Sequence, residues 1–113
     1  MKIAMPVDEN KGMDSRICEH FGQTPFWAVY DTETKKLEIK PKTSQHMGGG
    51  CLPIDEVMEY KPDMLFVLGM GWNAINRCTN EGIVVKTGNF LTVKEVVNNL
   101  DKLKDMTEGC EQN

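Results

Sequence analysis

The first forty residues carry their apolar side chains in short runs typical of β-strands. Residues 2–7, KIAMPV, and residues 26–31, FWAVYD, are rich in β-branched, aromatic and other apolar side chains. Residues 36–40, KLEIK, alternate polar and apolar positions, as a half-exposed strand does. Pro6 has no backbone N–H to donate, which favours an edge strand or a strand terminus. We therefore expect three strands in an antiparallel meander.

The second half of the chain changes to helical spacing interrupted by apolar runs. Apolar residues recur with helical period between Pro53, which suits a first turn, and Pro62, which ends the helix. The runs at 64–68, MLFVL, and at 83–85 predict strands that are covered on both faces. Residues 72–80 predict a short helix between these two strands.

A last helix is predicted from a start signal followed by an apolar stripe. Thr92 and Glu95 have the spacing of a capping box, and apolar residues continue from Val93 to Leu103. The element order β-β-β-α-β-α-β-α predicts an α/β domain with a five-stranded mixed sheet and helices packed on it. We expect one domain over residues 1–104, followed by a mobile polar tail over residues 105–113.

The length, composition and net charge of the chain exclude several classes of protein. The 113 residues fit one compact domain, and 40% hydrophobic with 27% charged residues indicates a folded soluble protein. The net charge is −4 and the longest basic run is Lys35-Lys36, which argues against nucleic-acid binding. No apolar run approaches the ~20 residues that cross a bilayer. We expect a cytoplasmic protein that contacts no membrane and whose four cysteines are reduced thiols.

Both histidines and two cysteines fall in loops and not on periodic faces. Cys18 and His20 lie between the first two predicted strands, and His46 and Cys51 lie between the third strand and the first helix. Thiolate and imidazole groups suit iron, copper or zinc, so these four residues are the candidate metal ligands. Their spacings match no standard zinc module, which leaves structural zinc as a weaker alternative.

Three consecutive glycines separate His46 from Cys51. A glycine run that leads into a helix can present backbone N–H groups to an anion, assisted by the helix dipole. A metal–sulfur cluster carries negative charge on its outside, so Gly48, Gly49 and Gly50 are predicted to help bind one. The alternative is a flexible linker loop without a ligand.

The remaining motifs give weaker evidence for a function. Residues 69–74 match G-x-G-x-x-A after a strand, but Lys86-Thr87-Gly88 stands where a dinucleotide site needs an acidic residue. A tight strand-to-helix turn whose glycines permit close packing is the preferred interpretation. Cys78 lies within a predicted helix and is expected to be packed, and Cys110 lies in the tail. No nucleophile elbow or oriented nucleophile–base pair is identified, so we expect a binding protein and not an enzyme.

Five segments together form a more specific pattern. They are Met1–Asp8, Asp14-Ser15 followed by His20-Phe21-Gly22, the His/Gly-rich residues 46–50, the turn at 69–74, and Gly82-Ile83-Val84. This ensemble, which covers residues 1 to about 100, resembles the dinitrogenase iron–molybdenum cofactor biosynthesis family. That family includes NifX-like and NafY-like cofactor carriers, the C-terminal domain of NifB and small stand-alone members.

The resemblance implies a fold and a function. It implies a ribonuclease-H-like three-layer α/β/α fold without nuclease activity, and binding or carriage of a metal–sulfur cluster or its precursor in nitrogen-fixation-related cofactor assembly. One related type, the orange protein, holds a molybdenum–copper–sulfide cluster. By position, His20 corresponds to the family's loop histidine and residues 46–51 to its flexible His/Gly loop. Cys18 and Cys51 depart from the nitrogenase-associated members, as does our expectation that the chain stands alone without an appended domain.

The expected cargo is therefore an iron–molybdenum or related metal–sulfur cluster, and the expected partner is a cofactor-assembly or acceptor protein. The chain itself is expected to be a monomer or weak dimer. The alternative function is a regulatory or interaction domain that binds a small anion or a partner protein without metal.

Overall fold

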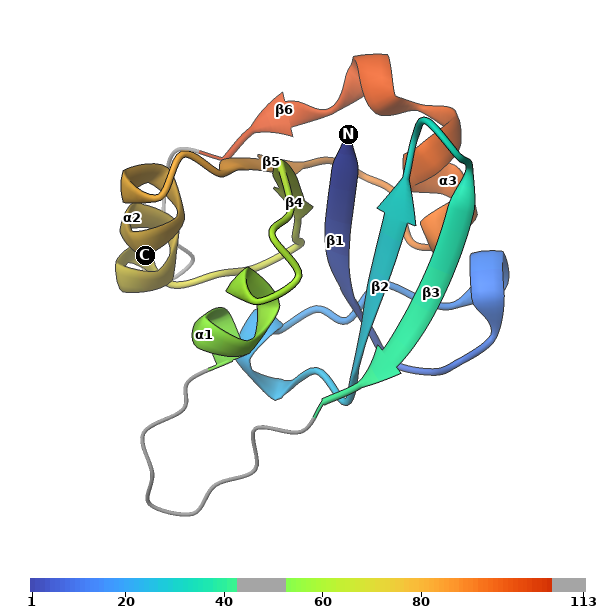
Figure 1. Cartoon of the computed structure of the whole chain (residues 1–113), viewed down its shortest axis with the longest axis horizontal. Coiled ribbons are helices and arrows are strands. Elements are labelled where there is room, and N and C mark those ends of the chain that lie inside the picture. Colours follow the sequence, from blue (N-terminus) through green and yellow to red (C-terminus); the bar gives the residue numbers. More distant parts are fainter. Residues whose placement is uncertain (43–52, 107–113) are drawn as a thin grey trace.

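A six-stranded mixed sheet in the order β3-β2-β1-β4-β5-β6 organises the chain in the computed structural model (Figure 1). The structure describes residues 1–42 and 53–106. In chain order, the elements are β1 (Lys2–Val7), the 3-10 helices η1 (Gly12–Asp14) and η2 (Phe21–Gln23), β2 (Phe26–Asp31), β3 (Lys36–Pro41), α1 (Pro53–Met58), β4 (Met64–Phe66), α2 (Trp72–Asn80), β5 (Val84–Thr87), α3 (Val93–Asn98), the 3-10 helix η3 (Leu100–Lys102) and β6 (Lys104–Asp105).

The predicted antiparallel meander is confirmed. β1 pairs with β2 from Lys2↔Asp31 to Val7↔Phe26, and β2 pairs with β3 in the same antiparallel sense. The edge-strand interpretation of Pro6 is wrong, because β1 lies in the middle of the sheet. Its position near a terminus is confirmed, since the described parallel pairs between β1 and β4 involve only Ile3 and Ala4. The carbonyl of Pro6 instead accepts the N–H of Cys18 at 2.8 Å.

The second half of the sheet is parallel, with one unpredicted strand at its edge. β4 pairs in parallel with β1 and β5 pairs in parallel with β4, whereas β6 runs antiparallel to β5. The predicted count of five strands is therefore wrong. β6 has two residues, both exposed, and so leaves no alternating pattern in the sequence. Asp105, expected to open the tail, lies in β6, and residues 107–113 of that tail lie outside the described residues.

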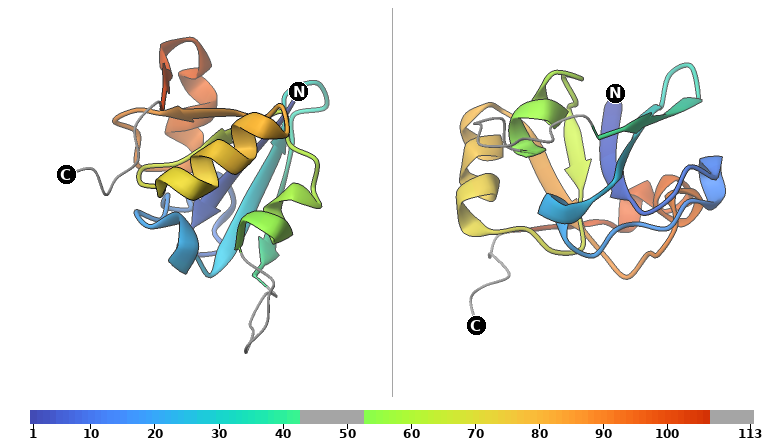
Figure 2. Two further views of the ribbon diagram at one scale, coloured as in Figure 1. Left: turned by 90° about the vertical axis from the view of Figure 1, so that its left-hand side faces the viewer. Right: turned by 90° about the horizontal axis from the view of Figure 1, so that it is seen from below.

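Helices lie on both faces of the sheet (Figures 1 and 2). α1 and α2 cover one face through Ile54, Val57 and Ile75, which pack with Leu65 and Trp27 of the sheet. α3 covers the other face, where its buried valines share a second apolar cluster with residues of β1, β2 and β4. This arrangement agrees with the expected layers, while the ribonuclease-H-like assignment remains a prediction.

The start of α3 shows how local sequence fixes an element. The Thr92 hydroxyl accepts the N–H of Glu95 at 3.2 Å, and the Glu95 carboxylate accepts the N–H of Leu91 at 2.8 Å. The predicted capping pair is thus confirmed, with the carboxylate bonded one residue before the cap. Within residues 1–42 and 53–106, no helix combines the length and apolarity that a bilayer crossing requires.

Candidate functional site

Four strands end at one edge of the sheet. β1, β4 and β5 are parallel, and β3 shares their direction because β2 is antiparallel to both of its neighbours. In open α/β sheets, ligands bind at the carboxyl edge, where neighbouring connections diverge. The connections that leave this edge carry His20, the turn at 69–71 and Lys42.

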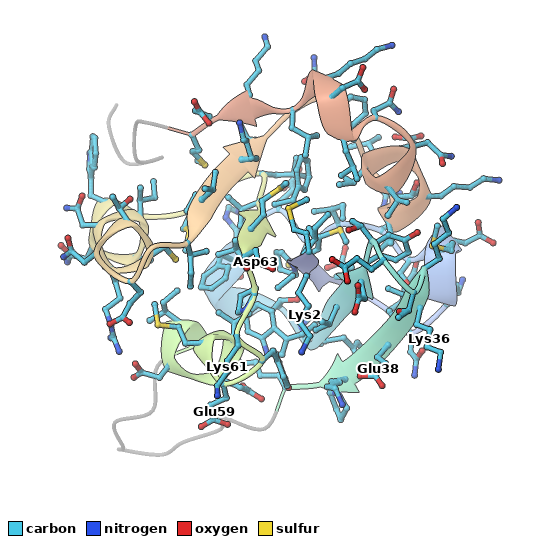
Figure 3. The ribbon with its side chains drawn as sticks, turned by 45° about the horizontal axis from the view of Figure 1, so that its top comes forward. Lys2, Lys36, Glu38, Glu59, Lys61 and Asp63 are labelled. Atoms are coloured by element: carbon cyan, nitrogen blue, oxygen red, sulfur yellow. The ribbon has the colours of Figure 1, made fainter. Side chains whose placement is uncertain are left out.

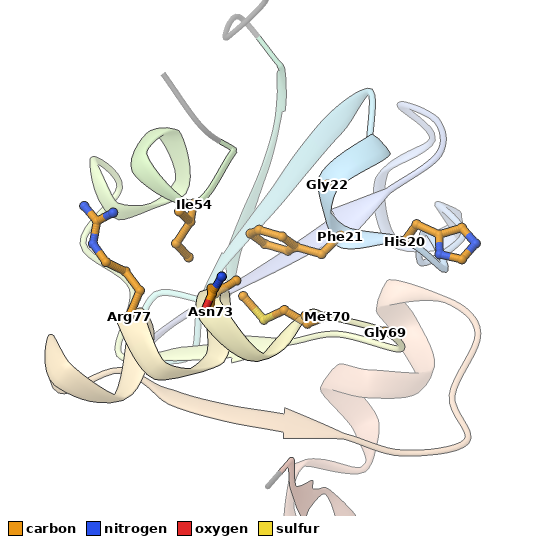
Figure 4. Close-up of a pocket in the computed structure, with 10 residues that line it drawn as sticks. His20, Phe21, Gly22, Ile54, Gly69, Met70, Asn73 and Arg77 are labelled. Carbon is orange, nitrogen blue, oxygen red and sulfur yellow. The ribbon is translucent and has the colours of Figure 1, made fainter. Parts of the chain in front are cut away.

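A pocket of about 500 Å³ opens between these connections and the first turns of α1 and α2 (Figure 4). This volume lies in the usual range for small-molecule sites. We call it the edge pocket; it is lined by His20, Phe21, Gly22, Ile54, Gly69, Met70, Gly71, Asn73, Ala74 and Arg77.

One wall of the edge pocket is built by close contact between two loops. The Phe21 N–H donates to the Gly69 carbonyl at 3.2 Å. A Cβ on Gly69 would lie 2.9 Å from the backbone oxygen of Glu19, so a larger residue forces the loops apart. The interpretation of the 69–74 segment as a close-packed turn is confirmed at Gly69. The histidine loop and the glycine turn therefore form one unit, although about fifty residues separate them in the chain.

The floor of the pocket is apolar and firmly packed. Met70 is 2% exposed, and Phe21 is also buried. The Phe21 ring lies against Trp27, with ring centroids 5.2 Å apart and planes tilted by 53°. Figure 4 shows Phe21, Met70 and Ile54 between the two ends of the pocket. The floor can thus offer a ligand a dry, polarisable surface and one thioether.

The polar groups stand at the rim. His20 is exposed at one end with its ring directed outward, and Arg77 lies at the other end, with Asn73 between them (Figure 4). Arg77 also joins the two helices, because its Nη2 donates to Oδ1 of Asp55 at 2.6 Å. The rim therefore combines an imidazole, an amide and a guanidinium above an apolar floor.

The structure places Cys18 apart from this rim. Its side chain is buried at 7% exposure, it does not line the edge pocket, and its Sγ donates to the His20 carbonyl at 3.4 Å. Burial raises the pKa of the Cys18 thiol, and the nearby Asp8 adds to this effect. A thiol binds metal as the thiolate. Ligation by Cys18 would therefore require its loop to open, and that role remains a prediction.

The other predicted site residues cannot be placed. His46, Cys51, Gly48, Gly49 and Gly50 lie outside the described residues. The described residues on either side of that segment are informative: Lys42 donates its Nζ to the Gly22 carbonyl at 3.1 Å, and Ile54 lines the edge pocket. Within residues 1–42 and 53–106, no three His, Cys, Asp or Glu side chains gather in a metal-binding group.

Two cysteines and two pocket residues remain to be compared with the predictions from the sequence. Cys78 is fully buried, which confirms its expected packing, and burial raises its pKa to about 11. Cys110 lies outside the described residues. Asn73 and Arg77 were not predicted as site residues. Their spacing of four residues on a helix that follows a glycine turn was the available signal.

Comparison with known proteins gives the same family by an independent route. The model of the dinitrogenase iron–molybdenum cofactor family matches residues 1–103. No curated protein sequence matches the chain.

Several solved structures share the fold. The apo form of the orange protein from Desulfovibrio gigas superposes with a TM-score of 0.80 at 20% identity, covering 95% of this chain and 93% of that one. A candidate NifB protein from Thermotoga gives 0.80 at 20% identity, covering 99% and 98%. A candidate dinitrogenase from Methanocaldococcus jannaschii gives 0.72 at 10% identity, covering 96% of both chains. At these identities the likeness shows the fold, whereas the match over residues 1–103 identifies the family. The chain belongs to the dinitrogenase iron–molybdenum cofactor family.

Proposed function

We propose that this protein is a non-catalytic carrier that binds a metal–sulfur cluster, of the iron–molybdenum or a related type, and delivers it during cofactor assembly. The family association with the iron–molybdenum cofactor gives the class of cargo. The observation that carries the proposal is the position of the edge pocket. It contains His20, and residues on both sides of the 43–52 segment contact its lining.

The pocket chemistry suits such a cargo in two ways. Sulfide-rich clusters are large and polarisable, and the floor of Phe21 and Met70 excludes water from one side of a ligand. Such clusters are also anionic, and Arg77 lies at the rim; its charge is paired with Asp55, but its guanidinium has further N–H donors that could bind the outer atoms of a cluster. An imidazole is a common ligand for iron and copper, so His20 is the proposed fixed ligand.

The 43–52 segment would supply the remaining ligands. We assign His46 and Cys51 as side-chain ligands and Gly48, Gly49 and Gly50 as backbone N–H donors to the outer atoms of the cluster. Ordering such a glycine-rich segment costs conformational entropy, which weakens binding. Moderate affinity serves a carrier, because the cargo has to leave for the acceptor protein.

The proposal extends to the location of the protein, its oligomeric state, its partners and its fold type. The chain acts in the cytoplasm as a monomer or weak dimer, and its partners are a cofactor-assembly protein that loads it and an acceptor that unloads it. The fold is of the ribonuclease-H-like type without that enzyme's activity.

The test uses loading of a supplied cluster under anaerobic conditions. We expect the double variant His46→Ala/Cys51→Ala to lose loading while its circular dichroism spectrum stays unchanged. His20→Ala should weaken loading. Gln23→Ala is the matched control, because Gln23 is exposed on η2 in the same loop but does not line the edge pocket. Full loading of both histidine variants would contradict the assignment.

A separate variant decides the role of Cys18. If Cys18 supports the loop only through its buried contact with the His20 carbonyl, Cys18→Ala should keep the stoichiometry of loading and lower the stability. If the loop opens and Cys18 becomes a ligand, the same variant should lose metal while keeping its fold. Metal content per chain, measured together with urea unfolding, separates the two results.

A further inference from the structure

We propose that the protein has a second ligand site, which binds a phosphate-type oxyanion in a recess at the end of β5. The recess has a volume of about 440 Å³ and lies between the connection that follows β5 and the segment of η3 and β6. Its polar lining comes from Thr87, Asn89, Lys102 and Lys104. It opens at the carboxyl end of a parallel strand, the edge where α/β sheets bind ligands.

The charged side chains that line the recess, among residues 1–42 and 53–106, have one sign. Lys102 and Lys104 line it, and none of the acidic residues in those ranges does. Among the described residues, neither ammonium group takes part in an ion pair. The neighbouring Lys86 differs, because it pairs with Asp105 at 2.7 Å. Two cations without an ion-pair partner in the part of the chain that the structure describes, on a chain of net charge −4, form a local site for an anion.

Neutral donors stand beside these cations. Thr87 faces Lys104 in the β5–β6 register, and facing residues project from the same side of a sheet. The hydroxyl of Thr87 and the ammonium of Lys104 can therefore reach one ligand together. Asn89, which also lines the recess, adds an amide that can donate a hydrogen bond. Hydroxyl, amide and ammonium donors are the groups that hold phosphate oxygens.

An apolar wall completes the recess. The Phe90 ring lies so close to Gly88 that a Cβ there would be 2.9 Å from its Cε2. The partly buried ring packs on the core cluster that includes Phe66, so the wall is fixed. A few donors beside a rigid apolar wall are typical of small-molecule sites. A phosphate ester would place its organic group on this wall, whereas free phosphate would use the donors alone.

A second charged groove provides the contrast. A hollow of about 660 Å³ near the amino end of β1 contains Lys2, Lys36 and Lys61, but Glu38 and Glu59 line it as well. Figure 3 shows these opposite charges distributed between the end of α1 and β3. Its mixed signs favour no simple anion. Its lysines therefore serve as controls for general electrostatic attraction.

The experiment is a titration of the metal-free protein with inorganic phosphate and with AMP at constant ionic strength, followed by amide NMR shifts. We expect saturable shifts at residues 87–90. Lys102→Ala/Lys104→Ala should weaken binding about tenfold or more, because it removes two charge-assisted hydrogen bonds. Lys36→Ala/Lys61→Ala changes the net charge equally and should leave the affinity within about twofold.

The two ligands identify the source of the oxyanion. Tighter binding of AMP, with added shifts at Phe90, would indicate a phosphate ester; equal affinity would indicate free phosphate, and either result supports the site. The proposal is overturned if neither ligand gives saturable shifts, or if the control pair weakens binding as much as the Lys102/Lys104 pair. Metal-free protein is used throughout, so the result does not depend on the proposed cluster.

Discussion

The contact between the histidine loop and the glycine turn can be tested at Gly69. In Gly69→Ala, the new Cβ would lie 2.9 Å from the Glu19 carbonyl oxygen, whereas ordinary contact begins near 3.4 Å. The two backbones must therefore separate by about half an ångström. The hydrogen bond from the Phe21 N–H to the Gly69 carbonyl, already 3.2 Å long, lies directly in the strained region.

The expected cost follows from these two effects. Overpacking of a tight site costs about 1–3 kcal/mol. A weakened backbone hydrogen bond adds up to about 1 kcal/mol, although the two effects overlap. We expect the free energy of unfolding to fall by about 1–3 kcal/mol, with the melting temperature lowered by about 4–8 °C for each kcal/mol. Cluster loading should weaken too, because His20 lies on the displaced loop.

Urea unfolding and calorimetry measure the change, and Gly22→Ala is the matched control. Gly22 lines the same pocket, but a Cβ there meets nothing within 4 Å. Its substitution should be neutral or stabilising by up to about 1 kcal/mol, since alanine restricts the unfolded chain. Equal stability of the two variants would refute the argument that Gly69 is required by close approach.

Three further predictions concern stability. Thr92→Ala should lower the free energy of unfolding, measured in urea, by about 1 kcal/mol because α3 loses its N-cap. Lys94→Ala, at an exposed neighbouring position, should change that free energy little. Equal losses in the two variants would contradict the capping role of Thr92. Since burial raises the pKa of Cys78 from 9.0 to about 11, the folded state holds this proton more tightly. That contribution, about 3 kcal/mol, is present below pH 9 and is lost as the pH rises to 11, so wild type should lose more stability over this range than Cys78→Ala. Parallel curves for the two proteins would contradict this. Arg77→Met should lower the free energy of unfolding in the same assay by less than about 1 kcal/mol, because the ion pair with Asp55 is partly exposed. A larger loss would contradict this and would mean that the ion pair holds α1 in place.

Strong local signals in the sequence predicted most of the fold. The bounds of β1 and β2 agree with the apolar runs at 2–7 and 26–31, and α2 agrees with the prediction for residues 72–80. These segments carry their own pattern and need no distant partner to be recognised. β6 was missed because two residues cannot show a period and the strand exists only through its pairing with β5.

The site was predicted less well, because it depends on contacts between distant segments. Cys18 and His20 look like two ligands of one loop, yet Cys18 turns inward and bonds Pro6 through its backbone while His20 faces outward. The contact that joins this loop to Gly69 has no periodic signal. Arg77 joins the pocket only because α2 packs beside α1. The sequence thus identified the histidine loop and the glycine turn separately, and the structure unites them.

The most direct test of the carrier proposal is isolation of the protein without air, followed by metal and acid-labile sulfide analysis and a visible absorption spectrum. The proposal predicts iron, molybdenum or copper together with sulfide in a fixed ratio to the chain, and a coloured protein. A colourless, metal-free protein that also refuses a supplied cluster would contradict it. That result would favour the alternative of an interaction domain.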